Sequence, residues 1–355
     1  MLGTGVVAVQ SAGLSVTTPL SVSSAMTSRI MLLAGAAAIC FLLGSLIRPD
    51  LLQRRWFVVT ALVTATVLAT VVLVPGIGRE VNGARRWLEL GPIGFQPSEL
   101  AKWAVVLSMA GACTWWVHRL GSFKWLCIIL LPAAVLCALV LKEDLGTAVL
   151  MAAVAGCVAL AAGARVWHMG VLAAVSAPAV AGAIAIEPYR VQRLQAFWDP
   201  FADPTGTGYH VIQSMAAIAG GGPSGRGLGN GIQKYGYLPE DTTDFIFAVI
   251  CEEAGLGGAL LVVGLLAGLL LVGWAVLRAS PSAHHRLLCL GVLLTIGGQA
   301  VMNLLVVTGL APTKGIALPL ISSGGTGWLL TAFALGWIRA IDRSTTTTFP
   351  PPLLA

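Results

Sequence analysis

Charged residues are scarce in this sequence: they make up only 10% of its 355 positions, with 15 acidic and 21 basic side chains. Soluble globular domains carry about 25% charged residues, so this composition excludes a soluble domain. Hydrophobic residues make up 57% of the chain. They gather in runs of about 20, long enough for a helix to cross roughly 30 Å of hydrocarbon. Alternating segments of about 10 residues, typical of a transmembrane barrel, are absent. The sequence therefore predicts an all-α polytopic membrane protein.

The cysteines lack the spacing of a functional site. There are seven, an odd number, and they lie mainly in apolar runs without any CxxC pair. Such cysteines are typical of small buried hydrophobes, so we predict neither disulfides nor a metal site. The net charge of +6 is modest, and we predict no nucleic-acid partner.

The apolar runs predict about ten transmembrane helices. The first run, Leu2–Gly13, reaches only about 18 Å as a helix and has no basic flank, so we interpret it as the outer end of a truncated first helix rather than a signal peptide. Nine full spans follow, and we place them at Arg29–Ile47, Trp56–Pro75, Ser98–Val117, Trp125–Leu141, Gly146–Ala164, Trp167–Ile186, Phe245–Leu277, Leu287–Leu310 and Thr326–Ile341.

The basic residues indicate the orientation, because cytoplasmic loops carry an excess of Lys and Arg. An outward first segment puts these residues in cytoplasmic loops: Arg48, Arg54, Arg55, Arg119, Lys124, Arg165, Arg278, Arg286, Arg339 and Arg343. We predict a single integral membrane domain over residues 1–355, with a short cytoplasmic tail at 344–355. Two longer segments, 76–97 and 187–244, then face outward. The second is a large extracytoplasmic loop between helices 7 and 8.

The first outer segment places cations beside the start of a span. We expect Ser98 to cap that helix and Lys102 to lie one turn inside it. A lysine there either snorkels to lipid headgroups or contacts an anion that enters from outside. Arg85 and Arg86 could bind the same anion, since guanidinium forks match phosphate. Trp87 is either an interfacial anchor or a platform for a sugar or lipid.

Other outer positions carry weaker signals. Asp144 is predicted to cap the helix that begins near Gly146, with a substrate contact as the alternative. His210 lacks companion ligands, so we predict no metal role for it. The glycine run Gly225–Gly231 carries no nucleotide-binding motif, and we interpret it as a flexible loop. Lys314 lies in a segment rich in Pro and Gly, where irregular backbone is expected, and could also contact an anion.

A group of acids marks the junction between the large loop and the next span. Glu240, Asp241 and Asp244 fall within five positions, and Thr242 or Thr243 is expected to cap the helix. The helix dipole would favour an ionised Asp244, the form that a general base needs, whereas burial would favour the neutral form. A simple helix-cap acid is the alternative.

Two further acids, Glu252 and Glu253, lie two turns into that span. Acids at membrane depth are functional by default or paired with another helix. Both interpretations stay open from the sequence.

Five motifs in order resemble the SEDS family, the bacterial shape, elongation, division and sporulation proteins FtsW, RodA and SpoVE. The resemblance covers nearly the whole chain and rests on the segments Asn82–Trp87, Gln96–Lys102, Asp144–Ala148, Leu238–Ala248 and Pro319–Gly325. Together these motifs are far more specific than any one alone. Residues 75–83 and 312–315 look more like the division branch, that of FtsW, than the elongation branch.

The resemblance implies a peptidoglycan glycosyltransferase in the bacterial cytoplasmic membrane that polymerises lipid II into glycan strands and releases undecaprenyl diphosphate. The family's essential aspartate matches Asp244, the implied general base. We expect Lys102, Arg86 and Lys314 to hold the diphosphate. Trp87 and the motif residues Glu240 and Ser323 are further expected substrate contacts.

The resemblance also implies partners: lipid II, the growing glycan strand, membrane lipid, a class B penicillin-binding protein that acts as transpeptidase, and other divisome proteins. It allows a divalent cation, Mg²⁺ or Mn²⁺, on the diphosphate, although no ligand cluster in the sequence requires one. The chain departs from the family pattern at Asp241, Thr242, Cys251 and Ser323, which bears on substrate or partner specificity.

Two other functions compete with this one. A lipid II flippase would also need outward cations and intramembrane polar groups, and Glu252 and Glu253 support it. A scaffold for the transpeptidase without catalysis would leave Asp244 without a purpose. An aspartate at the outer helix end favours chemistry over both.

Overall fold

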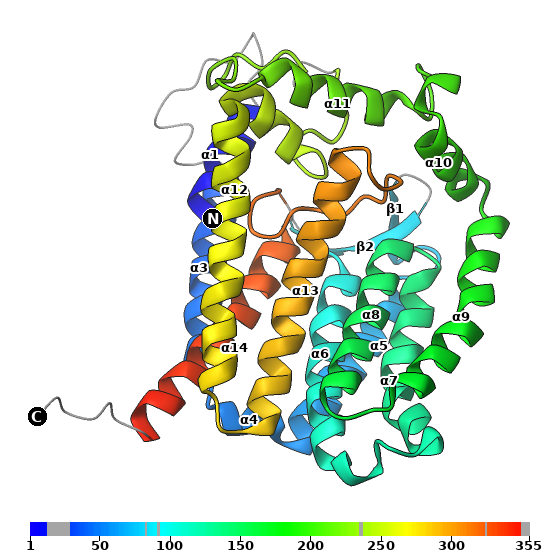
Figure 1. Cartoon of the computed structure of the whole chain (residues 1–355), viewed down its shortest axis with the longest axis vertical. Helices are drawn as coiled ribbons and strands as arrows, with labels where there is room; N and C mark the ends of the chain where they lie inside the picture. Colours follow the sequence, from blue (N-terminus) through cyan, green and yellow to red (C-terminus); the bar gives the residue numbers. More distant parts are fainter. Residues whose placement is uncertain (13–28, 82–83, 91–92, 234–236, 324, 349–355) are drawn as a thin grey trace, which may run out of the picture. The chain divides into compact units, whose positions relative to one another are not determined.

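The computed structural model describes residues 1–12, 29–81, 84–90, 93–233, 237–323 and 325–348. Its elements are nearly all helical (Figure 1). In chain order they are α1 (Leu2–Ala12), α3 (Arg29–Leu46), α4 (Pro49–Gln53), α5 (Arg55–Val71), β1 (Gly78–Val81), β2 (Ala84–Leu90), β3 (Ile93–Phe95), α6 (Pro97–Trp115), η1 (Val117–Arg119), α7 (Phe123–Leu141), α8 (Leu145–Ala161), α9 (Val166–Ile186), α10 (Pro188–Trp198), η2 (Pro200–Ala202), α11 (Tyr209–Gly221), α12 (Ile246–Ala279), α13 (Ala283–Val307) and α14 (Thr326–Thr348).

Each of the ten apolar runs contains one helix, which confirms the predicted fold class. The matching helices are α1, α3, α5, α6, α7, α8, α9, α12, α13 and α14. Five of these, α3, α7, α9, α12 and α13, are long and apolar enough to cross a membrane. The number of spans stays a prediction.

The backbone contacts divide the chain into two compact units. The first comprises Met1–Ala36, Val180–Leu269 and Gly297–Gly324, and the second Ala37–Ala179, Leu270–Ile296 and Gly325–Ala355. Helices α3, α9, α12 and α13 each run from one unit into the other. The predicted single domain stays a prediction.

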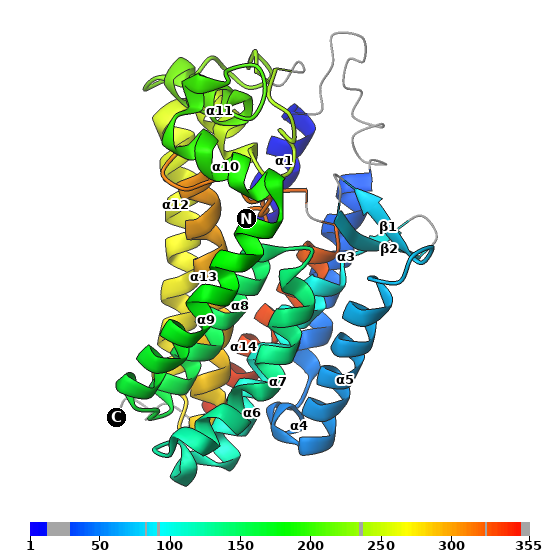
Figure 2. The same ribbon diagram turned by 90° about the vertical axis from the view of Figure 1, so that its right-hand side faces the viewer.

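The second unit contains a small sheet that the sequence did not predict. Strand β2 pairs antiparallel with both β1 and β3, and a register shift falls between Arg79 and Glu80. The strands fill the first outer segment, between the end of α5 and the start of α6 (Figure 2). Surface ion pairs link the strands, with Arg79 Nη1 to Glu89 Oε1 at 2.8 Å and Arg85 Nε to Glu80 Oε2 at 3.4 Å.

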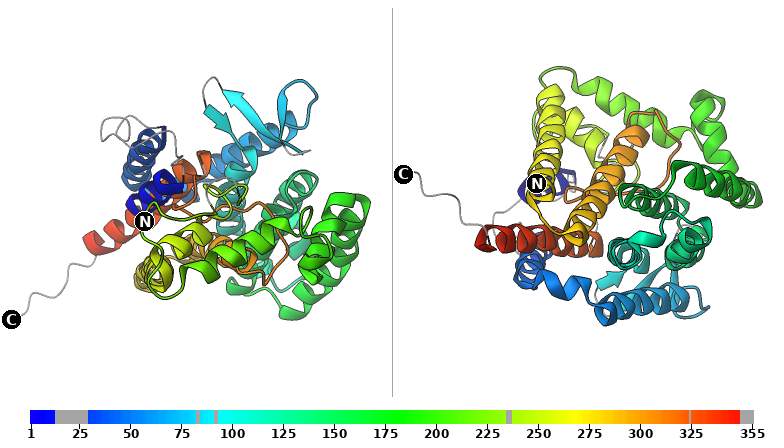
Figure 3. Two further views of the ribbon diagram at one scale, coloured as in Figure 1. Left: turned by 90° about the horizontal axis from the view of Figure 1, so that it is seen from above. Right: turned by 60° about the horizontal axis from the view of Figure 1, so that its bottom comes forward.

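Helices α3 and α14 of the second unit approach each other through glycines. A Cβ at Gly44 would lie 2.2 Å from the carbonyl oxygen of Phe333, and one at Gly336 would lie 2.5 Å from that of Phe41. Small residues of this kind allow close approach of membrane helices. In Figure 3, α14 is red and α3 is blue.

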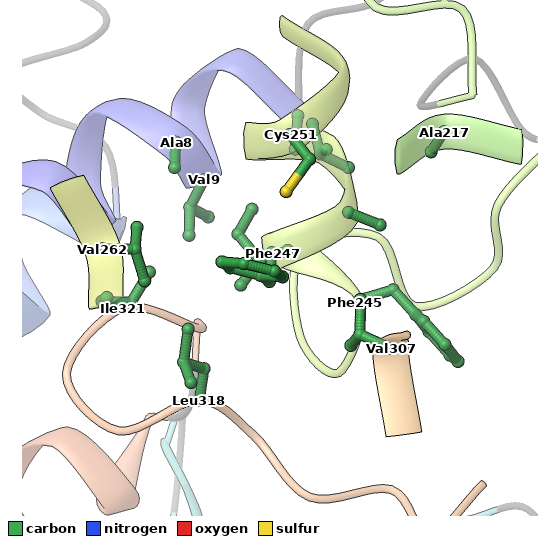
Figure 4. Close-up of a cluster of buried hydrophobic side chains, with 14 of the residues drawn as sticks. Ala8, Val9, Ala217, Phe245, Phe247, Cys251, Val262, Val307, Leu318 and Ile321 are labelled. Atoms are coloured by element: carbon green, nitrogen blue, oxygen red, sulfur yellow. The ribbon is translucent and has the colours of Figure 1, made fainter. Parts of the chain in front are cut away.

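The first unit is built around a hydrophobic cluster at the start of α12. Phe245 and Phe247 pack there with Val9 of α1, Val307 of α13 and Leu318 (Figure 4). The large outer loop is partly helical, because α10, η2 and α11 lie within it. Helix α12 is interrupted at Gly255, whose φ of 60° and ψ of −152° are not helical.

We predict that Gly44→Ala lowers the thermal stability of the protein, because the added methyl group overlaps the Phe333 carbonyl. Overpacking of this kind costs about 1–3 kcal/mol. The control is Gly35→Ala on the same helix, where a Cβ meets nothing within 4 Å. Thermal unfolding in detergent measures both variants, and equal midpoints would contradict the close approach of α3 and α14.

Candidate active site

Asp244 lies in a tight turn of the first unit, before α12 begins at Ile246. The carbonyl oxygen of Glu240 closes this turn by accepting the N–H groups of Thr243 at 3.1 Å and Phe245 at 3.2 Å. Glu240 itself has a φ of 56°, a left-handed conformation that is uncommon for a residue other than glycine. The structure thus puts Asp244 before the helix, not in its first turn as expected.

Thr242 and Thr243 do not cap α12 as predicted. The hydroxyl of Thr243 donates to Glu240 Oε2 at 2.8 Å, and the carbonyl of Thr242 accepts the N–H of Ser323 at 2.9 Å. Because α12 begins at Ile246, neither threonine is its N-cap: Thr243 stabilises the turn, and Thr242 links the turn to Ser323.

Ser323 is therefore brought to the Asp244 turn through the backbone. Its motif is held by the hydroxyl of Ser322, which accepts the N–H of Leu318 at 2.7 Å, and by Leu320 with a φ of 61°. Lys314 lies earlier in the same connection between α13 and α14, and partial burial lowers its pKa from the usual 10.5. The structure thus places Glu240, Asp244, Lys314 and Ser323 in one unit.

His210 of α11 also contacts this turn. Its ring stacks on that of Phe245, with centroids 6.0 Å apart and planes 18° from parallel. Burial and the positive charge of Arg193 lower the pKa of His210, while Glu240 acts in the opposite direction. This aromatic contact, which sequence reasoning did not find, fixes α11 against the Asp244 segment.

Arg86 and Trp87 lie in the second unit, on β2. Arg86 Nε is buried and has no hydrogen-bond partner among the described residues. It lines a pocket with Arg85, Ser98 and Asp144. Trp87 lies against the backbone of β3, since a Cβ at Gly94 would be 3.2 Å from the indole. Glu143 fixes β2 from the α7–α8 turn, because its Oε2 accepts the N–H of Arg85 at 2.7 Å.

Lys102 forms an internal ion pair. It is 2% exposed, and its Nζ lies 2.8 Å from Glu99 Oε1 within the first turns of α6. A buried lysine is stabilised by such a partner, so neither lipid snorkelling nor an incoming anion is needed to explain it. Contact between Lys102 and a substrate stays a prediction.

The capping predictions for α6 and α8 have opposite outcomes. Asp144 caps α8, since its carboxylate accepts the N–H of Thr147 at 3.0 Å and the hydroxyl of that residue at 2.7 Å. Ser98 as the cap of α6 is wrong: the N-cap is Gln96, and Pro97 opens the helix. Proline suits that first position because its fixed φ is helical and it lacks an N–H.

Glu252 holds the glycine-rich loop onto α12, and the Glu253 side chain contacts α1. The Glu252 carboxylate accepts the N–H groups of Ile232 at 3.0 Å and Gln233 at 3.2 Å and pairs with Arg226 at 3.5 Å. Glu253 accepts the hydroxyl of Ser11 from α1. Pairing with another helix is therefore confirmed for Glu253, whereas Glu252 is paired with the loop, which is more fixed than its glycines indicate.

Among the described residues, no group of three His, Cys, Asp or Glu side chains is placed to hold a metal ion. The divalent cation on the diphosphate stays a prediction. The candidate residues fall into two groups: Asp244, Glu240, Lys314 and Ser323 in the first unit, and Arg86, Trp87 and Lys102 in the second.

Residues 1–347 match the FtsW/RodA/SpoVE family, described as cell cycle proteins. The chain belongs to this family. It is accordingly a multi-pass membrane protein, as its apolar helices indicate.

The sequence of this chain aligns with those of similar proteins along most of their length. The chain is 42% identical over 288 residues to the probable peptidoglycan glycosyltransferase FtsW of Nitrosococcus halophilus (strain Nc4). The aligned region covers 78% of this chain and 73% of that protein. It is also 42% identical over 288 residues to the protein of that name from Alkalilimnicola ehrlichii (strain ATCC BAA-1101 / DSM 17681 / MLHE-1). That aligned region covers 79% of this chain and 71% of the relative.

Solved structures share the fold. A chain from a peptidoglycan synthase complex that coordinates polymerization and crosslinking is 29% identical, with a TM-score of 0.78 and coverage of 97% of this chain and 95% of that chain. The rod shape determining protein RodA of Thermus thermophilus is 25% identical, with a TM-score of 0.68 and coverage of 97% of this chain and 93% of the RodA chain.

We predict that Glu252→Ala loosens the glycine-rich loop, since two backbone N–H groups and Arg226 lose their acceptor. Each buried group left unsatisfied costs about 1–3 kcal/mol. The measurements are the thermal midpoint and the rate of proteolysis within residues 225–233. The control is Glu89→Ala, which removes only an exposed ion pair. Equal sensitivity of both variants would contradict the role of Glu252.

Proposed function

We propose that this protein is a peptidoglycan glycosyltransferase of the division type, which polymerises lipid II at the outer face of the bacterial cytoplasmic membrane. The observation that carries the proposal is the 42% identity, over most of both chains, to relatives named as such enzymes. The motif aspartate, Asp244, supports it because it lies in a turn fixed by backbone hydrogen bonds at the end of a long apolar helix.

The reaction is a displacement at the anomeric carbon of the donor sugar. The 4-hydroxyl oxygen of the acceptor forms a bond to that carbon, and the bond from the carbon to the diphosphate oxygen breaks. The proton of the hydroxyl passes to the Asp244 carboxylate, and undecaprenyl diphosphate leaves with the bonding electron pair. A general base of this kind must lie within about 2.6–3.2 Å of the proton-bearing oxygen. A fixed turn suits that requirement.

Cations stabilise the leaving diphosphate, because negative charge grows on it in the transition state. Lys314 and Arg86 are our candidates. Lys314 lies in the connection that is bonded to the Asp244 turn, and Arg86 carries a buried Nε without a partner among the described residues. Lys102 has a smaller part, since Glu99 already balances its charge.

Glu240, Ser323 and Trp87 are proposed substrate contacts. Glu240 is exposed, and Ser323 and Trp87 are half-buried. A class B penicillin-binding protein is the proposed transpeptidase partner, by analogy with the synthase complex that this fold resembles. A flippase is not proposed, because Glu252 and Glu253, which favoured it, have structural partners.

We predict that Asp244→Asn abolishes polymerisation of purified lipid II by the protein together with its transpeptidase partner. The amide cannot accept the proton, and loss of a general base lowers the rate by about 10²–10⁴-fold. The assay is gel separation of the glycan strands.

The matched control is Asp342→Asn, the same chemical change on α14 and outside the Asp244 turn, which we expect to polymerise like the wild type. Equal polymer from Asp244→Asn and wild type would remove Asp244 from the mechanism. Wild-type protein that folds, binds its partner and makes no polymer would contradict the proposed function.

We predict that activity falls at high pH as Lys314 loses its proton. The ammonium group is charged below its pKa and neutral above it, and burial lowers that pKa from 10.5, so the loss begins at a lower pH than for a free lysine. Lys314→Arg, which stays charged, should extend activity to higher pH. The measurement is the polymerisation rate against pH. Coincident profiles for the two proteins would exclude Lys314 as the cause.

A further inference from the structure

Asn303 of α13 joins two segments of the first unit that are far apart in the sequence. Its side chain is 1% exposed, and its Nδ2 donates to the carbonyl oxygens of Asp244 and Ile316, each at 2.7 Å. One side-chain amide thus uses both of its N–H groups. One bond reaches the proposed base, and the other reaches the connection that carries Lys314, two residues away.

The Asp244 carbonyl suits this bond because of where α12 begins. In a continuous α-helix the carbonyl of Asp244 would accept the N–H of Ala248. That N–H instead donates to the carbonyl of Phe245 at 2.9 Å. The Asp244 carbonyl therefore lies outside the helical ladder, and Asn303 satisfies it. A buried carbonyl without a donor would be costly.

The chemistry of the contact requires an amide. Both partners of Asn303 are carbonyl oxygens, which accept only, so the side chain must present its NH₂ group to them. An aspartate of the same size has no donor when ionised. The exchange of Asn for Asp therefore removes both bonds with little change in volume.

A neighbouring side chain makes a related but simpler contact. Gln299 lies one turn earlier on α13, and its Nε2 donates to the carbonyl of Ala317 at 2.8 Å. It contacts the same connection that Asn303 reaches at Ile316.

We infer that Asn303 is a positioning residue, which sets the Asp244 turn and the Lys314 connection at a fixed separation. It acts through these segments and does not touch the reacting atoms. This inference rests on the proposed function, in which Asp244 takes the proton and Lys314 faces the leaving diphosphate. A displacement of about 1 Å in such a group can cost about 10²-fold in rate.

The experiment compares wild type with Asn303→Asp and Asn303→Ala in complex with the transpeptidase partner. Purified lipid II polymerisation gives kcat and KM, and hydrogen–deuterium exchange reports on segments 237–248 and 312–323. Gln299→Ala is the matched variant on the same helix. Asn230→Ala, which changes an exposed asparagine of the glycine-rich loop, is the control.

We expect both Asn303 variants to lower kcat by about 10- to 100-fold and to change KM for lipid II less than about 3-fold, with faster exchange in both segments. Gln299→Ala should speed exchange in 312–323, and Asn230→Ala should speed it in neither segment. Unchanged exchange in 237–248, or a fall in kcat matched by the loss of folded protein, would overturn the inference. An inactive wild type would refute the proposed function, while the exchange data would still test the bridge.

Discussion

Backbone groups that leave a helix within an apolar protein must find other partners, and this constraint governs the candidate site. The turn at Asp244 and the connection around Ile316 are both irregular, and water is scarce where they are buried. Their carbonyls are satisfied by amide side chains of α13, those of Asn303 and Gln299. The glycine-rich loop is held in the same way, by Glu252. Side chains on the helices α12 and α13 thus hold these irregular segments in place.

Buried charges follow a similar rule. Lys102 lies beside Glu99, and Glu252 lies beside Arg226 as well as two backbone N–H groups. A charge in a medium of low dielectric constant is tolerated when it is paired and hydrogen-bonded. This pairing separates structural ions from candidate functional ones. Lys102 already has a partner inside the protein, whereas Arg86 has a buried Nε with no partner among the described residues and stays our candidate for binding an anion.

Much of the fold followed from the sequence, because membrane helices are local structures. Length and apolarity placed the ends of nine of the ten helices within about four residues, whereas α14 continues past the predicted Ile341 into the predicted tail and ends at Thr348. The cap at Asp144 also followed, since its bonds reach only three residues ahead. The cap at Ser98 was wrong because Pro97 takes the first helical position and moves the cap to Gln96. The sheet was missed because its short strands lie among charged residues with little alternation.

The sequence by itself determined the class of protein, the positions of its helices, its family resemblance and the identity of Asp244 as the candidate base. Those properties depend on composition and on motifs read along the chain. Only the tertiary structure decided what the polar side chains do. Asn303 and Gln299 could have been noticed as polar residues one turn apart in an apolar helix, which is a signal of a shared face. Their partners could not, since Asp244 lies 59 positions from Asn303 in the chain. Such contacts exist only once packing brings distant segments together, and local sequence carries no record of them.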